Sequence, residues 1–182
     1  MSATIHLIVQ LTVRLLRGYC LGVAGFGLYR FRGWFKISDI IYLNMRFNNI
    51  LPELYVVDFQ KSLNFYTKIL DFKLEYEQLD PLFAFLSYQG SQLMIQQEDD
   101  DEEWHNGKPE YPYGRGVNFQ IETKDVQKII DLLAKNNYPL KRGVKESWYK
   151  VNDTFHGHRE ILIMDPSGYL LRFSQSLGVK KE

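Results

Sequence analysis

From residue 50 onward, hydrophobic residues follow the repeat of two that is typical of strands and the spacing of three and four that is typical of helices. Residues 51–57 alternate and predict a strand, and Asp58 follows as a helix N-cap. The helix extends to about residue 70, because one of its faces carries Phe59, Leu63, Tyr66 and Leu70. Three further strands are predicted at 73–78, 82–88 and 92–97. This half of the domain therefore reads as a strand, a helix and three strands, a βαβββ module.

The same order of elements recurs after a linker or flap at residues 96–116. A strand is predicted at 117–122, Asp125 is the next N-cap, and the hydrophobic face of the following helix consists of Val126, Ile129, Ile130 and Leu133. The last three strands are predicted at 146–151, 159–164 and 169–175, and Asp165-Pro166-Ser167-Gly168 suits a type I turn between the last two. We therefore predict one α+β domain over residues 46–178, with modules at about 50–97 and 116–178.

Residues 1–44 do not share this periodicity. The stretch 5–29 is apolar, but Arg14 and Arg17 interrupt it, and five glycines between residues 18 and 33 weaken a helix. We interpret residues 1–44 as an N-terminal extension outside the fold, with Met45 as an alternative start. A membrane anchor is the competing interpretation.

A chain that begins at Met45 is expected to unfold cooperatively, because the repeat and its core begin after that residue. Chemical denaturation and gel filtration of the shortened and full chains measure this. Precipitation of the shortened chain, or loss of a dimer, would show that residues 1–44 pack on the domain or anchor it.

Charge and cysteine content narrow the class of partner. Residues 1–44 hold five Lys or Arg and one Asp, so the rest of the chain has seventeen basic and twenty-one acidic residues. A mildly acidic domain argues against nucleic acid as a partner. The single Cys20 forms no intramolecular disulfide, so a reducing cytoplasm is the expected compartment, and no membrane partner is expected of the domain.

Five segments together resemble a known family. They are Leu51–Asp58, Lys61–Tyr66, Gly116–Glu122, the pair Arg159-Glu160, and Asp165–Phe173. In this order they resemble the vicinal oxygen chelate superfamily, which includes glyoxalases, bleomycin resistance proteins and dioxygenases. Within it they look most like the metal-free bleomycin resistance proteins. The resemblance implies two βαβββ modules that form a curved mixed sheet around a cup, completed as a homodimer.

The resemblance also implies where enzymes of this superfamily hold their metal. The corresponding positions here are Leu51, Gln96, Asn118 and Arg172. Leucine cannot ligate a cation, arginine brings a positive charge, and the asparagine amide is a weak ligand. Only Gln96 could serve, so we expect no metal and no cofactor.

Strand alternation predicts which side chains face the cup. On the polar side we expect Glu53, Tyr55, Gln96, Asn118, Gln120 and Arg172. A concave face of this kind suits a small organic ligand, whereas the alternative is a solvated sheet face. Near the rim, Trp148, His156 and Arg159 are further ligand candidates, with His156 and His158 in a rim loop. The alternative for these two histidines is a metal site on a strand.

No nucleophile and base pair with the spacing of a known catalytic motif is present in the sequence. The sequence therefore favours a non-catalytic binding protein of bleomycin-resistance type, active in antibiotic resistance, which sequesters an aromatic or cationic ligand in a dimer groove. The acidic run at 98–103 suits a cationic guest, or is only a solvated loop. The alternative function is a lyase or isomerase of the glyoxalase type, or a dioxygenase-like enzyme, with an atypical metal site.

Overall fold

The computed structural model describes residues 46–99 and 107–181. Residues 1–44, which we interpreted as an N-terminal extension, lie outside the described residues, and so does most of the acidic run at 98–103. In chain order the elements are β1 (Glu53–Val56), α3 (Phe59–Asn64), η1 (Phe65–Ile69), β2 (Lys73–Leu79), β3 (Leu82–Tyr88), β4 (Ser91–Gln97), β5 (Asn118–Glu122), α4 (Val126–Lys135), β6 (Arg142–Val151), β7 (Thr154–Met164) and β8 (Leu170–Lys181). Among these described residues, no helix is long and apolar enough to cross a membrane.

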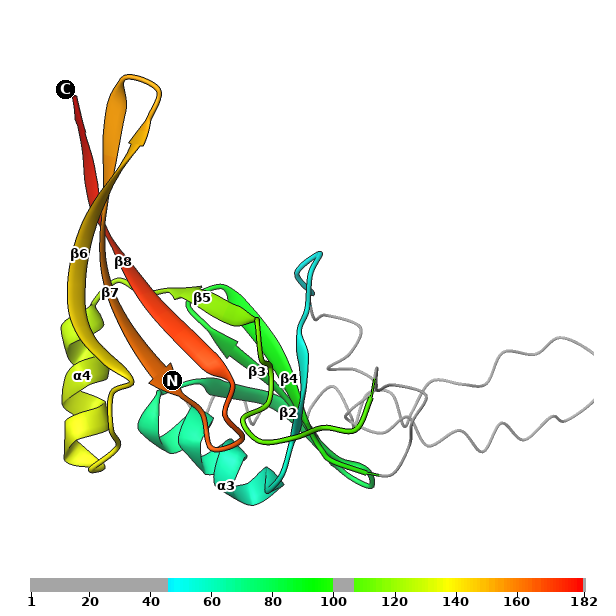
Figure 1. Ribbon diagram of the computed structural model, residues 1–182. Helices are drawn as coiled ribbons and strands as arrows, with labels where there is room; N and C mark the ends of the chain where they lie inside the picture. Colours follow the sequence, from blue (N-terminus) through cyan, green and yellow to red (C-terminus); the bar gives the residue numbers. More distant parts are fainter. Residues whose placement is uncertain (1–45, 100–106, 182) are drawn as a thin grey trace, which may run out of the picture. The chain divides into compact units, whose positions relative to one another are not determined.

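The strands form two four-stranded mixed sheets, one in each module (Figure 1). Their orders are β1-β4-β3-β2 and β5-β8-β7-β6, and the parallel pairs are β1 with β4 and β5 with β8. The predicted fold class, α+β with two βαβββ modules, is confirmed. Within the described residues no strand of one sheet is hydrogen-bonded to a strand of the other, so the two sheets stay separate.

Both helices start where the sequence predicts. The carboxylate of Asp58 accepts a hydrogen bond from the Lys61 N–H at 2.9 Å, and Asp125 accepts one from the Lys128 N–H at 3.2 Å. Each cap satisfies one of the backbone N–H groups that a helix leaves without a partner at its N-terminus. The first helix continues from α3 into η1, a π-helical turn that ends with the Leu70 N–H bonded to the Phe65 carbonyl.

Strand register confirms the predicted alternation. Leu54 pairs with Ile95 and both are buried, while Tyr55 pairs with Gln96 on the opposite face. In the second sheet Ile121 pairs with buried Phe173, and Gln120 pairs with Arg172 on the polar face. Each sheet therefore has one face in the core and one outside it.

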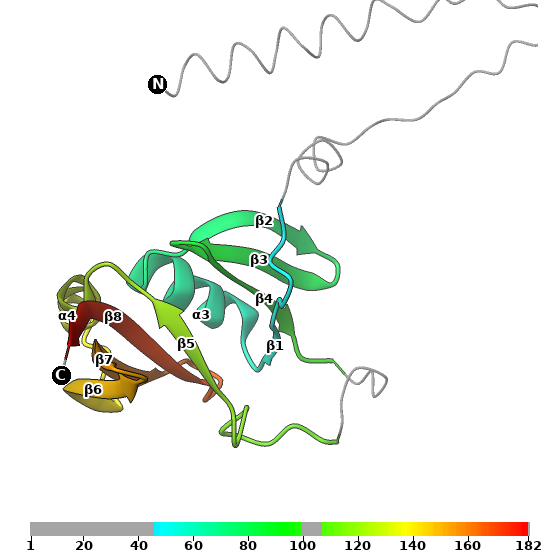
Figure 2. The same ribbon diagram turned by 90° about the horizontal axis from the view of Figure 1, so that it is seen from above.

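One hydrophobic core is shared by both modules. Figure 2 shows α3 between the strands of the two sheets, and ring contacts cross from one module to the other. The Phe65 and Tyr138 rings lie 4.7 Å apart, and those of Tyr88 and Phe173 lie 5.8 Å apart. Because the apolar faces of both sheets pack into this core, the opposite face of each sheet points away from it.

A buried carboxylate joins the modules beside this core. Asp165 lies in the turn between β7 and β8, and it accepts hydrogen bonds from the N–H groups of Ser167 and Tyr169 at 2.9 and 2.8 Å. Its other oxygen accepts one from the hydroxyl of Tyr66, in η1 of the first module, at 3.0 Å. Burial raises the pKa of Asp165 to about 6, although these hydrogen bonds act to lower it.

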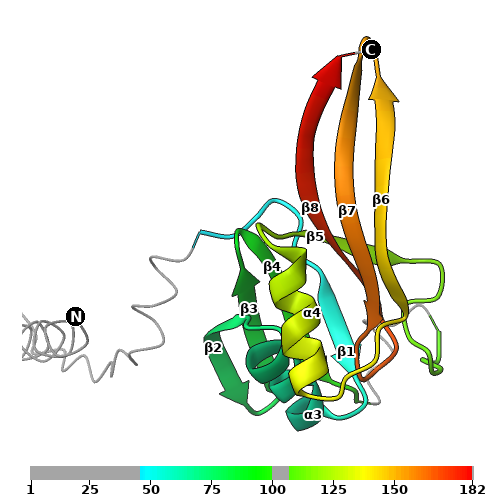
Figure 3. The ribbon, with the colours of Figure 1, turned by 90° about the vertical axis from the view of Figure 1, so that its left-hand side faces the viewer.

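Three expectations about the second module were wrong. His156 and His158 lie inside β7 and not in a rim loop, because β6, β7 and β8 extend well beyond the predicted strands. Figure 3 shows these three strands continuing past the end of α4. Val117, the first residue of the strand predicted at 117–122, precedes β5 and is half exposed.

Candidate functional site

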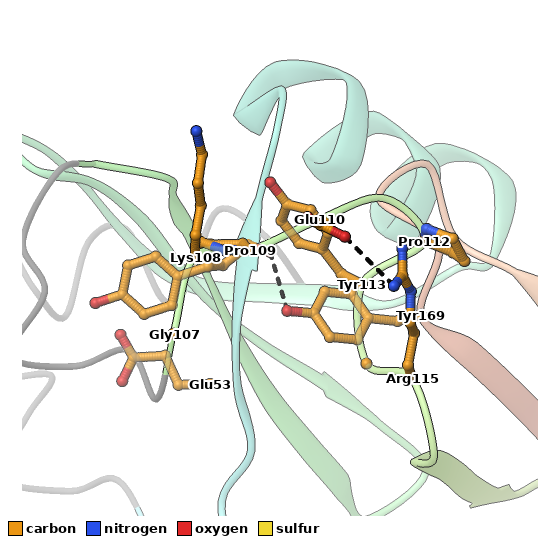
Figure 4. A pocket seen from close by; sticks show the side chains of 11 residues that line it. Glu53, Gly107, Lys108, Pro109, Glu110, Pro112, Tyr113, Arg115 and Tyr169 are labelled. Atoms are coloured by element: carbon orange, nitrogen blue, oxygen red, sulfur yellow. Dashed lines mark hydrogen bonds and ion pairs between the residues drawn. The ribbon is translucent and has the colours of Figure 1, made fainter.

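A pocket of about 590 Å³ lies where β1 meets the linker between the modules. Its walls are Glu53 and Tyr55 from β1, Tyr169 from the second module, and the linker residues Gly107, Lys108, Pro109, Glu110, Pro112, Tyr113, Gly114 and Arg115. Figure 4 shows Glu53 and Arg115 toward opposite ends of the pocket, with the rings of Tyr113 and Tyr169 between them. The pocket thus combines aromatic walls with charges of both signs.

Hydrogen bonds fix the aromatic walls. The Tyr169 hydroxyl donates to the Tyr55 carbonyl at 3.2 Å, and the Tyr113 hydroxyl donates to the carboxylate of Glu98. The Tyr113 and Tyr169 rings lie 6.0 Å apart, edge to face. Burial raises the pKa of Tyr113 to about 12, with help from Glu98. Both phenols therefore stay protonated at neutral pH and serve as hydrogen-bond donors.

The charges in the pocket are partly neutralised. Arg115 pairs with Glu110 at 3.4 Å and donates to the Tyr111 carbonyl at 2.9 Å. Desolvation in the pocket raises the pKa of Glu53, and no cationic side chain among the described residues forms an ion pair with it. This carboxylate is exposed and has no cationic partner among the described residues, so it can pair with a ligand that supplies one.

An aromatic cluster covers the face of the first sheet that points away from the shared core. It consists of Phe47, Tyr76, Phe83 and Phe85, and Phe85 is fully buried although it lies outside the shared core. The rings of Phe47 and Phe85 lie 5.3 Å apart, and Tyr76 contacts Phe83 and Phe85 at 5.6 and 5.5 Å. Strand alternation could have revealed it, since Phe83 and Phe85 are two residues apart in β3.

The candidate residues predicted from the first module lie together. Glu53 and Tyr55 line the pocket, and the Gln96 amide donates to the Tyr55 hydroxyl at 3.4 Å. The sequence did not single out the linker tyrosine Tyr113 or the second-module Tyr169 as wall residues. The prediction of a linker or flap at residues 96–116 was the one signal that this segment could cover a pocket.

The candidate residues from the second module form a separate group. Gln120 and Arg172 are cross-strand neighbours, and Asn118 pairs with Leu170 in the same register. These residues lie on the polar face of the second sheet, so the predicted cup residues are divided between two faces. One chain therefore does not bring them into a single cup.

The rim candidates lie on the extension formed by β6, β7 and β8. His156 contacts the Thr154 hydroxyl at 3.2 Å, and Arg159 pairs with Glu146 at 2.6 Å. Arg159 pairs with Gln175 on the face opposite to its neighbour Glu160. Trp148 lies over Gly157, where an added Cβ would come within 2.8 Å of the indole, and the Lys180 amine stands 4.2 Å above its ring. These three residues are not part of the pocket.

The residues at the superfamily's metal positions do not fit a metal. Gln96 already bonds Tyr55, Arg172 lies 3.5 Å from Glu160, and Asn118 is an exposed amide on the other sheet. Among residues 46–99 and 107–181, no three His, Cys, Asp or Glu side chains are grouped so that they could hold a metal ion. A cation at the second-sheet positions, Asn118 and Arg172, would meet the guanidinium of Arg172.

A family model and several solved structures match the chain. The family model for the Glyoxalase/Bleomycin resistance protein/Dioxygenase superfamily matches residues 46–173. A superfamily member from Vibrio splendidus is 26% identical, with 70% of this chain and 97% of that chain covered and a TM-score of 0.33. A virulence protein from Salmonella typhimurium is 19% identical, with 72% and 98% covered and a TM-score of 0.51.

A glyoxalase/bleomycin resistance protein/dioxygenase from Alicyclobacillus acidocaldarius is 21% identical, with 74% of this chain and 96% of that chain covered and a TM-score of 0.51. No curated protein matches the chain.

Proposed function

We propose a metal-independent, non-catalytic binding function for this chain, which belongs to the Glyoxalase/Bleomycin resistance protein/Dioxygenase superfamily. Its ligand is an aromatic or cationic organic molecule, as in a bleomycin-type resistance protein. The observation that carries the proposal is the pocket of about 590 Å³ with two tyrosine walls and the carboxylate of Glu53, whose pKa is raised by desolvation. Aromatic faces and an anionic carboxylate both attract an aromatic cation.

A symmetric homodimer is part of this proposal. The two polar faces of one chain point away from its shared core, so a closed cup needs the face of a second copy. Such an arrangement would give two equivalent binding sites. Analytical ultracentrifugation measures the oligomeric state directly, and a monomer at tens of micromolar would contradict this part.

Metal content separates this proposal from a glyoxalase-type enzyme. After incubation with Zn²⁺, Ni²⁺, Mn²⁺ or Fe²⁺ and desalting, the protein is expected to hold clearly less than one metal ion per chain, because the positions are Leu51, Gln96, Asn118 and Arg172. Elemental analysis provides the measurement. Tight binding of one ion per chain that disappears in Gln96→Ala would overturn the proposal.

Ligand binding tests the pocket itself, with benzamidine as an aromatic cation. At concentrations well above its Kd the probe is expected to raise the melting temperature by several degrees, because it binds only the folded state. Glu53→Gln should remove most of this rise. Glu77→Gln, an exposed glutamate of β2, is the matched control and should retain it. An equal rise in wild type and Glu53→Gln would place the probe elsewhere.

A further inference from the structure

A buried acid stands between two arginines on the polar face of the second sheet. Glu160 in β7 is 5% exposed, although it lies on the face that points away from the core. Arg172 of β8 approaches one of its carboxylate oxygens at 3.5 Å, and Arg142 of β6 approaches the other at 3.8 Å. Three neighbouring strands thus contribute one side chain each.

The two arginines are not satisfied by this acid. Both distances are longer than those of charge-assisted hydrogen bonds, which are about 2.7–2.9 Å. Arg142 Nε and Nη2 and Arg172 Nε are buried without a hydrogen-bond acceptor in the described structure. Buried donors of this kind are rare because each forfeits its bonds to water. Their presence points to an acceptor that comes from outside the chain.

The surroundings of the arginines favour an anion as that acceptor. Glu160 balances one of the two guanidinium charges, and Lys145, its register partner in β6, adds a third positive charge to this face. Gln120 of β5 lies beside Arg172 and offers an amide donor. The whole side chains of Arg142 and Arg172 are 39% and 33% exposed, so a solute can approach the nitrogens of each guanidinium group that are not covered.

We propose that Arg142 and Arg172 form an oxyanion-binding site for the acid group of a small molecule, a carboxylate, phosphonate or phosphate. The planar guanidinium group binds such groups with two parallel hydrogen bonds. Glu160 holds the two arginines in place and limits the affinity, because its own carboxylate competes with that of the ligand. The site lies on the second sheet and uses none of the pocket residues, so it goes beyond the binding function proposed above.

Titration of the full chain with phenylphosphonate and with benzoate, at constant ionic strength and followed by calorimetry, tests the site. At least one of the two acids is expected to bind. Arg172→Gln and Arg142→Gln should each weaken that binding at least tenfold. Arg159→Gln is the matched control, because it removes the same charge from the same strand as Glu160 but on the opposite face. Its affinity should equal that of the wild type.

Glu160→Gln provides the decisive arm, because a purely structural role for the three side chains predicts no gain. It should bind the acid several-fold more tightly, since the competing carboxylate is gone while its shape is kept. The proposal is overturned if neither acid binds the wild type, if Glu160→Gln leaves the affinity unchanged or lower, or if Arg159→Gln weakens binding as much as Arg172→Gln. If an arginine variant fails to fold, the measurement on Glu160→Gln still tests the proposal.

The same proteins separate this site from the pocket. Glu53→Gln should lose benzamidine binding and keep the wild-type affinity for the acid. If Glu53→Gln loses binding of phenylphosphonate or benzoate, the acid binds in the pocket and the proposal of a second site is overturned. This conclusion does not depend on whether benzamidine binds.

Discussion

The free energy of unfolding is expected to fall by roughly 2 kcal/mol as the pH rises from about 4 to about 6, because of Asp165. Burial raises the pKa of this carboxyl in the folded protein to about 6, from an ordinary value of 3.8. Between these values the folded state holds a proton that the unfolded state has released. Protonation therefore favours folding, and this contribution is lost as the pH rises through about 6.

Asp165→Asn is expected to abolish this part of the pH dependence. The amide oxygen can still accept from the N–H groups of Ser167 and Tyr169, and the amide N–H group can donate to the Tyr66 hydroxyl oxygen. Urea denaturation at pH 4, 5, 6 and 7 measures the difference between the two proteins. A curve for Asp165→Asn that is parallel to the wild-type curve would show that other groups cause the dependence.

Tyr66→Phe is the control, because it should shift the pH dependence to higher pH, whereas Asp165→Asn should abolish it. It removes a hydrogen bond that favours the ionised form of Asp165, so the pKa of this carboxyl should rise further and the sensitive range should extend above pH 6. At pH 7 the variant should lose about 1.5–3 kcal/mol, the usual contribution of a hydrogen bond to a charged group. At pH 4, where the carboxyl is protonated, the loss should be smaller.

Gly168→Ala is expected to destabilise the protein by about 2–4 kcal/mol, for two additive reasons. Its φ of +96° is unfavourable for any residue with a Cβ, and that Cβ would lie 2.6 Å from the Cα of Pro112 in the linker. Since the obstacle is backbone, it cannot rotate away. Pro112 and its neighbour Tyr113 line the pocket, so benzamidine binding should weaken as well.

Gly90→Ala isolates the contribution of the linker. Gly90 has almost the same φ, +93°, but an added Cβ there meets no atom within 4 Å. Its variant should therefore show only the backbone cost, about 1–2 kcal/mol. Chemical denaturation of both variants gives the difference directly. Equal losses would mean that the linker does not pack on the turn at Gly168 as described.

Features that depend on a few neighbouring residues were predictable. The N-caps at Asp58 and Asp125, the order of strands and helices, and the alternation of Leu54 with Tyr55 all follow from side-chain chemistry and from the periods of the helix and the strand. The ends of the strands were less predictable. In β6 and β8 the pairing of strands with one another continues over exposed polar residues, and no hydrophobic pattern marks its end.

The sequence by itself determined two βαβββ modules and which side chains alternate between the two faces of each strand, because both are properties of local backbone geometry. Only the tertiary structure decided how those faces are used. Packing of both apolar faces into one core separates Tyr55 from Arg172, and it seats Tyr113 and Tyr169 beside Glu53. The burial of Glu160 between Arg142 and Arg172 likewise depends on contacts among three strands, which no local pattern encodes.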